Sequence, residues 1–216
     1  MQTDLVYLVD IDNTLLDNDT VVADLKHHLV DAFGAEAEQR YWAIFEELWH
    51  EHGYADYFGA FQRLRVERPR DPQAIRASLF LLRYPFAARV FPGALDAIAA
   101  LQRRAKVVIL SDGDAVAQPN KIARSGLLDA VDGDVLIYIH KEEMLDDVER
   151  RYPARRYVMV DDKIRILAAI KAIWRERVTT VFVRQGSYAA DRAEVARYPP
   201  ADAAIDRIGE IVDVAL

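Results

Sequence analysis

The sequence feature that most constrains the fold is a series of short, uninterrupted apolar runs rich in β-branched residues. Four runs are clear and a fifth is similar, at residues 5–9, 106–110, 157–160, 178–183 and 134–139. Such continuous runs are typical of strands buried on both faces of a sheet. Helical patterns separate most of them, at residues 94–103, 119–125, 141–151 and 163–175. This alternation predicts a three-layer α/β/α fold with a Rossmann-like parallel sheet, to which residues 203–214 could add a short strand and a helix.

One long segment interrupts this alternation. Between about residues 18 and 89 the strand signal is missing, and helical patterns occur at residues 21–33, 35–52, 54–66 and 72–82. We therefore expect an α/β core domain made of residues 1–17 and 90–216, with residues 18–89 inserted into it as a helical bundle. The two linkers, near residues 16–19 and 88–93, are the expected hinges between them.

Composition excludes several classes of protein. The chain has 28 Lys and Arg residues against 35 Asp and Glu residues, and this acidic balance argues against nucleic-acid or anionic-membrane partners. The absence of cysteine excludes disulfides, thiolate nucleophiles and iron–sulfur clusters. No apolar run approaches the roughly 18 residues of a membrane helix, and the first residues do not resemble a signal peptide. We expect a cytoplasmic protein, and the sequence indicates no oligomeric state.

Acidic and hydroxyl-bearing residues follow three of the predicted strands. Asp10 and Asp12 follow the first strand, Ser111 follows the second, and Asp161 and Asp162 follow the run at 157–160. The carboxyl ends of parallel strands meet at one edge of an open α/β sheet, where ligands bind. Clustered carboxylates repel one another, and no histidine stands beside them, so the pattern favours Mg²⁺ over zinc. Acidic helix caps explain one such strand end, but not three.

Four stretches, in this order, resemble the motifs of the haloacid dehalogenase superfamily of phosphatases. They are Asp10-Ile11-Asp12-Asn13-Thr14, Ser111, Lys141, and Asp161-Asp162. The resemblance extends from about residue 5 to residue 183, and the inserted helices fall where one class of cap domain in that superfamily is placed. It implies a haloacid dehalogenase-like core with a helical cap.

The chain departs from the superfamily pattern in two places. Glu142 follows the third-motif lysine, where proline is frequent, and Asp112 stands where asparagine is frequent. Lys121 is a competing candidate for the third-motif lysine, although it precedes the fifth apolar run. Asp112 either adds negative charge near the metal or faces away.

The resemblance also implies roles for single residues. Asp10 is the expected nucleophile, which forms an aspartyl-phosphate, and Asp12 the expected general acid and base. Lys141 adds positive charge, and Ser111 and Asp112 belong to the phosphate-binding group. Thr14 is placed in the same group, with a main role in fixing the loop.

The resemblance implies a metal site as well. Mg²⁺ is expected to be bound by Asp10, by the main-chain carbonyl of Asp12, by Asp162 directly and by Asp161 through a water molecule. In phosphoryl transfer such a cation shields the nucleophile from the charge of the substrate.

The expected function is therefore a Mg²⁺-dependent phosphomonoester hydrolase that acts on a small phosphorylated metabolite. A phosphotransferase or phosphomutase would use the same residues, and a non-catalytic binding module could keep the fold; both alternatives stay open. A dehalogenase is disfavoured, because dehalogenation in this superfamily uses no second aspartate and Asp12 is present. The substrate itself is not predicted.

Aromatic residues recur along the inserted segment at helical spacing. Tyr41, Phe45 and Trp49 lie four residues apart, and a second series consists of Tyr54, Tyr57, Phe58 and Phe61. Such stripes could stack a ring of a ligand. Because a small bundle needs apolar stripes for its own core, we expect them to serve packing.

Overall fold

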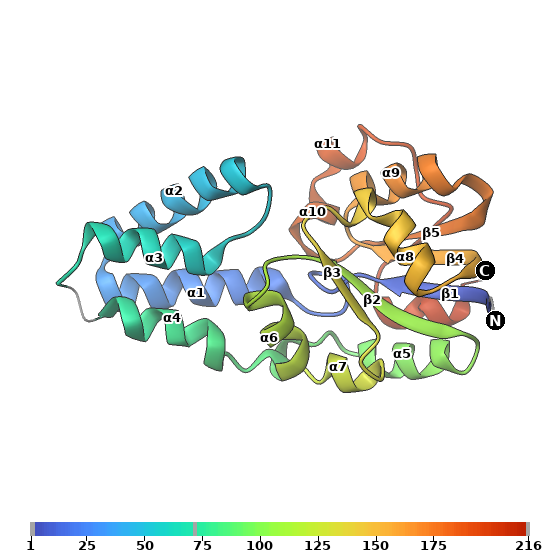
Figure 1. Cartoon of the computed structure of the whole chain (residues 1–216), viewed down its shortest axis with the longest axis horizontal. Coiled ribbons are helices and arrows are strands. Elements are labelled where there is room, and N and C mark those ends of the chain that lie inside the picture. The colour runs from blue at the N-terminus through green and yellow to red at the C-terminus, as the bar shows by residue number, and fades with distance from the viewer. Residues whose placement is uncertain (1–2, 71–72, 215–216) are drawn as a thin grey trace.

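The computed structural model describes residues 3–70 and 73–214, except for the side chains of residues 73–76 and 78. A parallel sheet with helices on both faces forms one part, and a group of helices lies beside it (Figure 1). The strands are β1 (Thr3–Val9), β2 (Lys106–Asp112), β3 (Val135–Tyr138), β4 (Ala154–Asp161), β5 (Val178–Val183) and β6 (Ala203–Ile205). Their order in the sheet is β3-β2-β1-β4-β5-β6. The predicted α/β fold is confirmed.

Alternate residues of β1 face the two opposite layers of the fold. Tyr7 and Val9 belong to the hydrophobic cluster on one face, and Val6 and Leu8 belong to the cluster on the other. The first face is covered by α5 (Ala94–Gln102), α6 (Ala117–Arg124), α7 (Leu127–Ala130) and the 3₁₀ segment η4 (Ile208–Asp213). The second face is covered by α8 (Leu145–Arg151) and α9 (Ile164–Trp174). Burial on both faces explains the uninterrupted apolar runs.

Several element boundaries differ from those expected. The helix expected at 141–151 is divided into a 3₁₀ turn, η2 (Lys141–Glu143), and α8, and the N–H of Met144 donates to the carbonyl of Lys141, three residues back (3.2 Å). The helix expected within 203–214 is the 3₁₀ segment η4, and the short strand β6 precedes it. Strand β4 begins earlier than its apolar run, since Ala154 pairs with Thr3 of β1.

Four helices fill the segment between β1 and β2. They are α1 (Asn18–Phe33), α2 (Ala35–His52), α3 (Tyr57–Glu67) and α4 (Gln73–Arg83), and the 3₁₀ turn η1 (Phe86–Arg89) follows them. Helix α3 begins later than expected because the Asp56 carboxylate accepts the N–H of Gly59 and so defines its first turn. The predicted start of the fourth helix, Pro72, lies outside the described residues.

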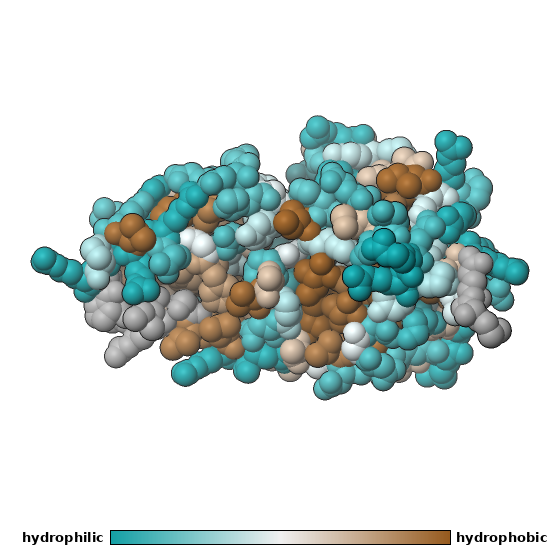
Figure 2. All heavy atoms as spheres, viewed as in Figure 1, coloured by the Kyte–Doolittle hydropathy of each residue, from teal (hydrophilic) through white to brown (hydrophobic). Residues whose placement is uncertain are grey.

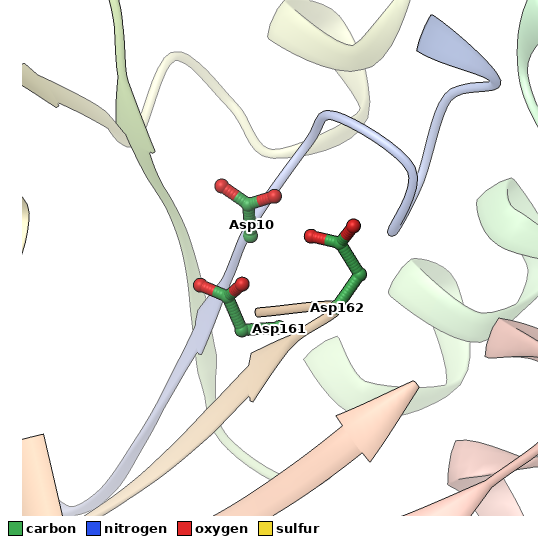
Figure 3. Close-up of side chains that lie close together, drawn as sticks. All are labelled: Asp10, Asp161 and Asp162. Carbon is green, nitrogen blue, oxygen red and sulfur yellow. The ribbon is translucent and has the colours of Figure 1, made fainter. Parts of the chain in front are cut away.

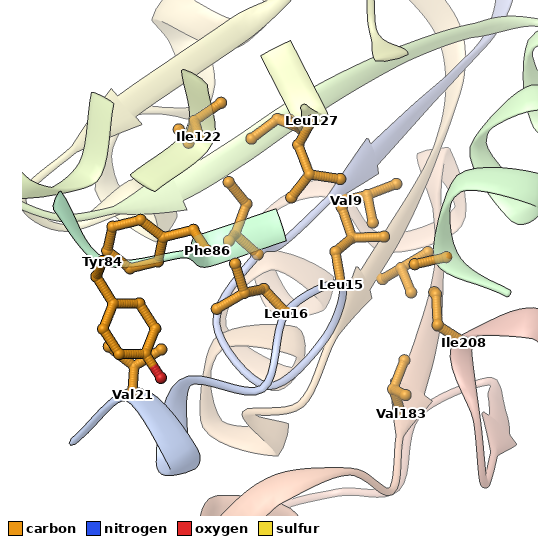
Figure 4. Packing of buried hydrophobic residues seen from close by; sticks show 14 of the residues in the cluster. Val9, Leu15, Leu16, Val21, Tyr84, Phe86, Ile122, Leu127, Val183 and Ile208 are labelled. Atoms are coloured by element: carbon orange, nitrogen blue, oxygen red, sulfur yellow. The ribbon is translucent and has the colours of Figure 1, made fainter. Parts of the chain in front are cut away.

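The two linkers of this segment are paired with each other. The N–H of Asp17 donates to the carbonyl of Arg89 (2.8 Å), and the N–H of Phe91 donates to the carbonyl of Leu15 (2.9 Å). One hydrophobic cluster continues from β1 through Leu16 into the base of the helices (Figure 4). The helices are thus anchored beside the carboxyl end of β1, between β1 and α5.

The surface is mostly hydrophilic in the view of Figure 2, with apolar residues gathered around its middle. Among the described residues, no helix combines the length and the apolar character that a membrane span requires.

Candidate active site

Three buried carboxylates meet where β1 and β4 end. Asp10 directly follows β1, Asp161 is the last residue of β4, and Asp162 comes next. These two strands are neighbours in the sheet, so their ends lie together, and one carboxylate oxygen of each residue lies within 4.8 Å of the others (Figure 3). The cluster joins the first and the fourth sequence motifs.

Lys141 reaches this cluster from the turn after β3. Its ammonium group lies 2.5 Å from Oδ1 of Asp10 and 2.7 Å from Oδ2 of Asp161, and its side chain is only 1% exposed. Burial opposes the charged form, but the two carboxylates outweigh it and hold the pKa of Lys141 well above its usual value. Lys141, rather than Lys121, therefore stands at the first carboxylate.

The cluster carries more negative charge than Lys141 neutralises. Both oxygens of Asp162 and Oδ2 of Asp10 are buried, and within the described structure they accept no hydrogen bond. Burial, reinforced by Asp161, raises the pKa of Asp162 to about 9. Burial raises the pKa of Asp10 to about 7, against the opposing effect of Lys141. Hard, unpartnered oxygens of this kind fit a divalent cation, which would restore the ionised form of both groups.

Asp12 lies beside this cluster and faces a cavity. Its Oδ1 is 2.6 Å from the ammonium group of Lys121, and its Oδ2 accepts a hydrogen bond from Nε2 of Gln118 (3.2 Å). Gln118 also donates to Oγ of Ser111 (2.8 Å), so it connects the first and the second motifs. Gln118 and Lys121, which both belong to α6, thus hold the carboxylate of Asp12 in one orientation.

The sequence interpretation did not assign these roles to Gln118 and Lys121. Their spacing of three residues places them on one face of a helix, and their helix follows the second motif closely. This spacing, on a helix close after the second motif, is the sequence signal from which Gln118 and Lys121 could have been identified. Lys121 is not a solvated surface residue. Its side chain is only 6% exposed, and its ammonium group also donates a hydrogen bond to Oδ1 of Asn18 (2.9 Å).

The remaining candidate residues are Ser111, Asp112 and Thr14, and each has a different set of contacts. Ser111 is buried beside Gln118, at the end of β2. Asp112 lines the cavity, and its Oδ1 accepts the main-chain N–H of Lys141 (2.8 Å). Thr14 is fully buried in the loop after β1, where its carbonyl accepts a hydrogen bond from Gln185 (3.1 Å). The structure thus brings Ser111 to Asp12, and it places Asp112 and Thr14 as supports of two loops.

Asn13 links the first motif to the helices that follow it. Its φ angle is 60°, and its Oδ1 accepts the N–H groups of Asn18 (3.0 Å) and Asp19 (3.1 Å) at the start of α1. Asp19 in turn accepts hydrogen bonds from Ser187 after β5. The loop that carries Asp10 and Asp12 is therefore fixed from two sides.

A cavity of about 490 Å³ opens above the second carboxylate. Its polar part includes Asp12, Gln118 and Lys163, and its other side consists of residues from α2 and from the loop between α2 and α3. Burial alone would lower the pKa of Lys163, but Asp10 and Asp161 outweigh it and raise this pKa. Lys163 and Arg165 thus supply positive charge to the lining, beside acidic residues such as Asp12 and Asp114.

Residues 6–173 match the family of haloacid dehalogenase-like hydrolases. The chain belongs to this family. A solved structure of a haloacid dehalogenase-like hydrolase from Burkholderia xenovorans is 60% identical to this hydrolase and superposes with a TM-score of 0.93, over 98% of this chain and 96% of that one. No curated protein matches the sequence. The four motifs predicted a hydrolase of this family, and the comparison confirms this prediction.

More distant structures share the fold of this haloacid dehalogenase-like hydrolase. A hydrolase from Xanthomonas campestris is 17% identical, with a TM-score of 0.70 over 98% of this chain and 90% of that one. An L-2-haloacid dehalogenase from Xanthobacter autotrophicus is 19% identical, with a TM-score of 0.64 over 99% of this chain and 98% of that one. At such identities the likeness shows the fold alone.

Proposed function

We propose that this hydrolase is a Mg²⁺-dependent phosphomonoesterase that acts on a small phosphorylated metabolite through an aspartyl-phosphate on Asp10. The observation that carries the proposal is the placement of Asp12, whose carboxylate faces the cavity and is held by Lys121 and Gln118. The alkoxide that leaves a phosphate ester needs a proton, whereas the halide that leaves a haloacid does not. A second, oriented carboxylate is therefore useful to a phosphatase and unnecessary to a dehalogenase.

Asp10 is the proposed nucleophile. Lys141 contacts its Oδ1 (2.5 Å), while its Oδ2 makes no hydrogen bond to the described residues. One carboxylate oxygen of Asp10 forms the new bond to phosphorus, and the bond between phosphorus and the ester oxygen breaks. Ser111 and Lys141 stabilise the oxygens of the transferred group.

Asp12 moves the protons in both halves of the reaction. In the first half it donates a proton to the departing ester oxygen, and in the second half it accepts one from the water that attacks phosphorus. Hydrolysis then releases inorganic phosphate and restores the carboxylate of Asp10. Lys121 and Gln118 keep Asp12 directed at the cavity, where both the leaving group and the water arrive.

The metal would be held by Asp10, the carbonyl of Asp12, Asp162 and Asp161. Both oxygens of Asp162 are free of described partners, which suits direct ligation. Asp161 already pairs with Lys141 and accepts the N–H of Lys163 (2.8 Å), which suits a contact through water. When bound, Mg²⁺ neutralises charge on the nucleophile and on the transferred phosphoryl group.

Residues 18–89 are the proposed cap, and residues 1–17 and 90–216 are the proposed catalytic core. The cavity lies between side chains of both parts, so a substrate would contact the core with its phosphate and the cap with its leaving group. Paired linkers at Asp17 and Arg89 would allow the cap to move as a unit.

The proposal is tested by assaying phosphate release from a panel of phosphate esters with Mg²⁺ and with excess chelator. In parallel, halide release from L-2-chloropropionate is measured without metal. The proposal predicts phosphate release that disappears with the chelator, and no halide release. Metal-independent halide release would contradict it, transfer to an added sugar phosphate would indicate a phosphotransferase, and no reaction in either assay would indicate a binding module.

A further inference from the structure

Helix α2 carries two apolar faces. One face consists of Ala37, Tyr41, Ile44 and Leu48, which are buried among the inserted helices. The second face consists of Trp42, Phe45 and Trp49, which line the cavity above Asp12. Packing explains the first face and part of the second, since Trp42 and Phe45 also pack against the hydrophobic cluster, but it does not explain the exposed Trp49.

The second face is aromatic and open to the cavity. Trp49 is 42% exposed, although a tryptophan in a soluble protein is usually well covered. The ring of Phe45 lies 5.3 Å from that of Trp42 and 4.9 Å from that of Tyr57, which lines the cavity as well. These rings, which lie edge-to-face (Trp42 and Phe45) or tilted (Phe45 and Tyr57), form an aromatic wall in the lining of the cavity.

Trp42 contributes its ring to the wall but no accessible polar atom, because its indole N–H is buried. Glu46 and His50, which lie on the same side of α2, add polar groups at the edge of the wall.

We propose that the substrate is a phosphate monoester whose leaving alcohol carries a flat heteroaromatic ring. This inference rests on the proposed function. The phosphate lies at Asp10 and Ser111, and the ring stacks on the wall formed by Trp42, Phe45 and Trp49. The cavity, at about 490 Å³, has the size of typical small-molecule sites.

Binding is measured separately from turnover, with the variant Asp10→Asn in the presence of Mg²⁺. The probes are the four common ribonucleoside 5′-monophosphates, which carry a heteroaromatic ring, and ribose 5-phosphate, which has the same sugar phosphate without a ring. Tryptophan fluorescence reports on Trp42 and Trp49, because Trp174 is buried against Tyr157 and lies outside the cavity. At least one nucleotide should quench the fluorescence and bind about tenfold or more tightly than ribose 5-phosphate.

One variant assigns the effect to the wall. In the Asp10→Asn background, Trp49→Ala should weaken binding of the best nucleotide about tenfold and leave ribose 5-phosphate unchanged. Val66→Ala, at an exposed position of α3 outside the cavity, is the matched control and should have no effect.

The inference is overturned if no nucleotide binds more tightly than ribose 5-phosphate, or if Trp49→Ala weakens both ligands equally. These outcomes concern binding alone. Failure of the proposed function would instead appear as selective nucleotide binding by Asp10→Asn without phosphate release by the wild-type enzyme.

Discussion

The ammonium group of Lys121 lies 2.6 Å from Oδ1 of Asp12, although the two residues are separated by 109 positions in the sequence. Helix α6 thereby holds the carboxylate that we propose as the general acid and base. The contact gives a residue outside the four sequence motifs a defined part in the reaction. Lys121 is a positioning residue in this account, since it acts on the substrate only through Asp12.

Replacing Lys121 by methionine should lower kcat/KM for alkyl phosphates by about 10- to 100-fold, because a misplaced catalytic group typically costs up to about 10² in rate. The loss of kcat/KM, which reports the first half of the reaction, should be large for alkyl phosphates, whose leaving group needs a proton, and small for p-nitrophenyl phosphate, whose leaving group does not. Lys26→Met, at an exposed lysine of α1, is the control. An equal loss for both kinds of ester would show that Lys121 merely supports the fold.

Asp162 and Asp161 should differ in their effect on metal binding. Because both oxygens of Asp162 are without described partners and those of Asp161 are engaged, Asp162→Asn should weaken Mg²⁺ binding by more than about 100-fold. Asp161→Asn should weaken it by only about tenfold. Calorimetric titration with Mg²⁺ measures both, and Asp4→Asn, at an exposed position of β1, is the control. Equal metal affinities of the two variants would contradict the assignment.

Asp112 should support catalysis through the main chain of Lys141. Its Oδ1 accepts the N–H of Lys141, so Asp112→Asn keeps an acceptor at this position and should leave kcat within about twofold to threefold. Asp112→Ala removes the acceptor and should lower kcat about tenfold, with little change in KM. Equal kcat values for the two variants would exclude this positioning role.

The inserted helices should be anchored in a pH-dependent manner at Asp24. The hydroxyl of Tyr84, and then Arg89 at 2.8 Å, lower the pKa of this carboxyl below its ordinary value of 3.8. The ionised group therefore stabilises the folded state fully above pH 3.8, and this contribution is lost as the pH falls toward the lowered pKa. Asp24→Asn should lower Tm at pH 7, and the difference from wild type should shrink below about pH 4. A difference in Tm that is constant from pH 7 to pH 3 would contradict this.

The sheet and the carboxylate cluster could be predicted because their signals are local. A strand buried on both faces appears as one continuous apolar run, and residues at the ends of parallel strands must meet at one edge. The position of Lys141 followed from motif order. Its contacts with Asp10 and Asp161, and the hydrogen bond from its N–H to Asp112, are tertiary contacts that motif order does not reveal.

The rest of the site could not be predicted, because the sequence does not reveal which face of each helix is turned toward the site. The face of α6 that carries Gln118 and Lys121 is turned toward Asp12 by packing that the spacing alone does not reveal. The aromatic series of α2 was expected to serve the core as a whole. The structure divides it, because Tyr41 packs on Phe61 whereas Trp49 faces the cavity.

The role of Asp12 as acid and base can be separated from that of Asp10 as nucleophile. Asp10→Asn should abolish turnover, because an amide cannot form the acyl-phosphate. Asp12→Asn should lower kcat by about 10²–10⁴-fold and let the intermediate accumulate, since its hydrolysis also needs a base. Single-turnover kinetics distinguish the two variants, and a faster decay of the intermediate in Asp12→Asn would contradict the assigned role.

The measurement that tests the central claim most directly is the location of the covalent intermediate. A substrate from the ester panel, labelled in its phosphoryl group, is mixed with the Mg²⁺-loaded enzyme and quenched in acid within milliseconds, and the labelled peptide is sequenced by mass spectrometry. The account predicts label on Asp10 in the wild-type enzyme and in Asp12→Asn, and none in Asp10→Asn. Label on Asp12 or on another residue, or turnover of Asp10→Asn at the wild-type rate, would contradict it.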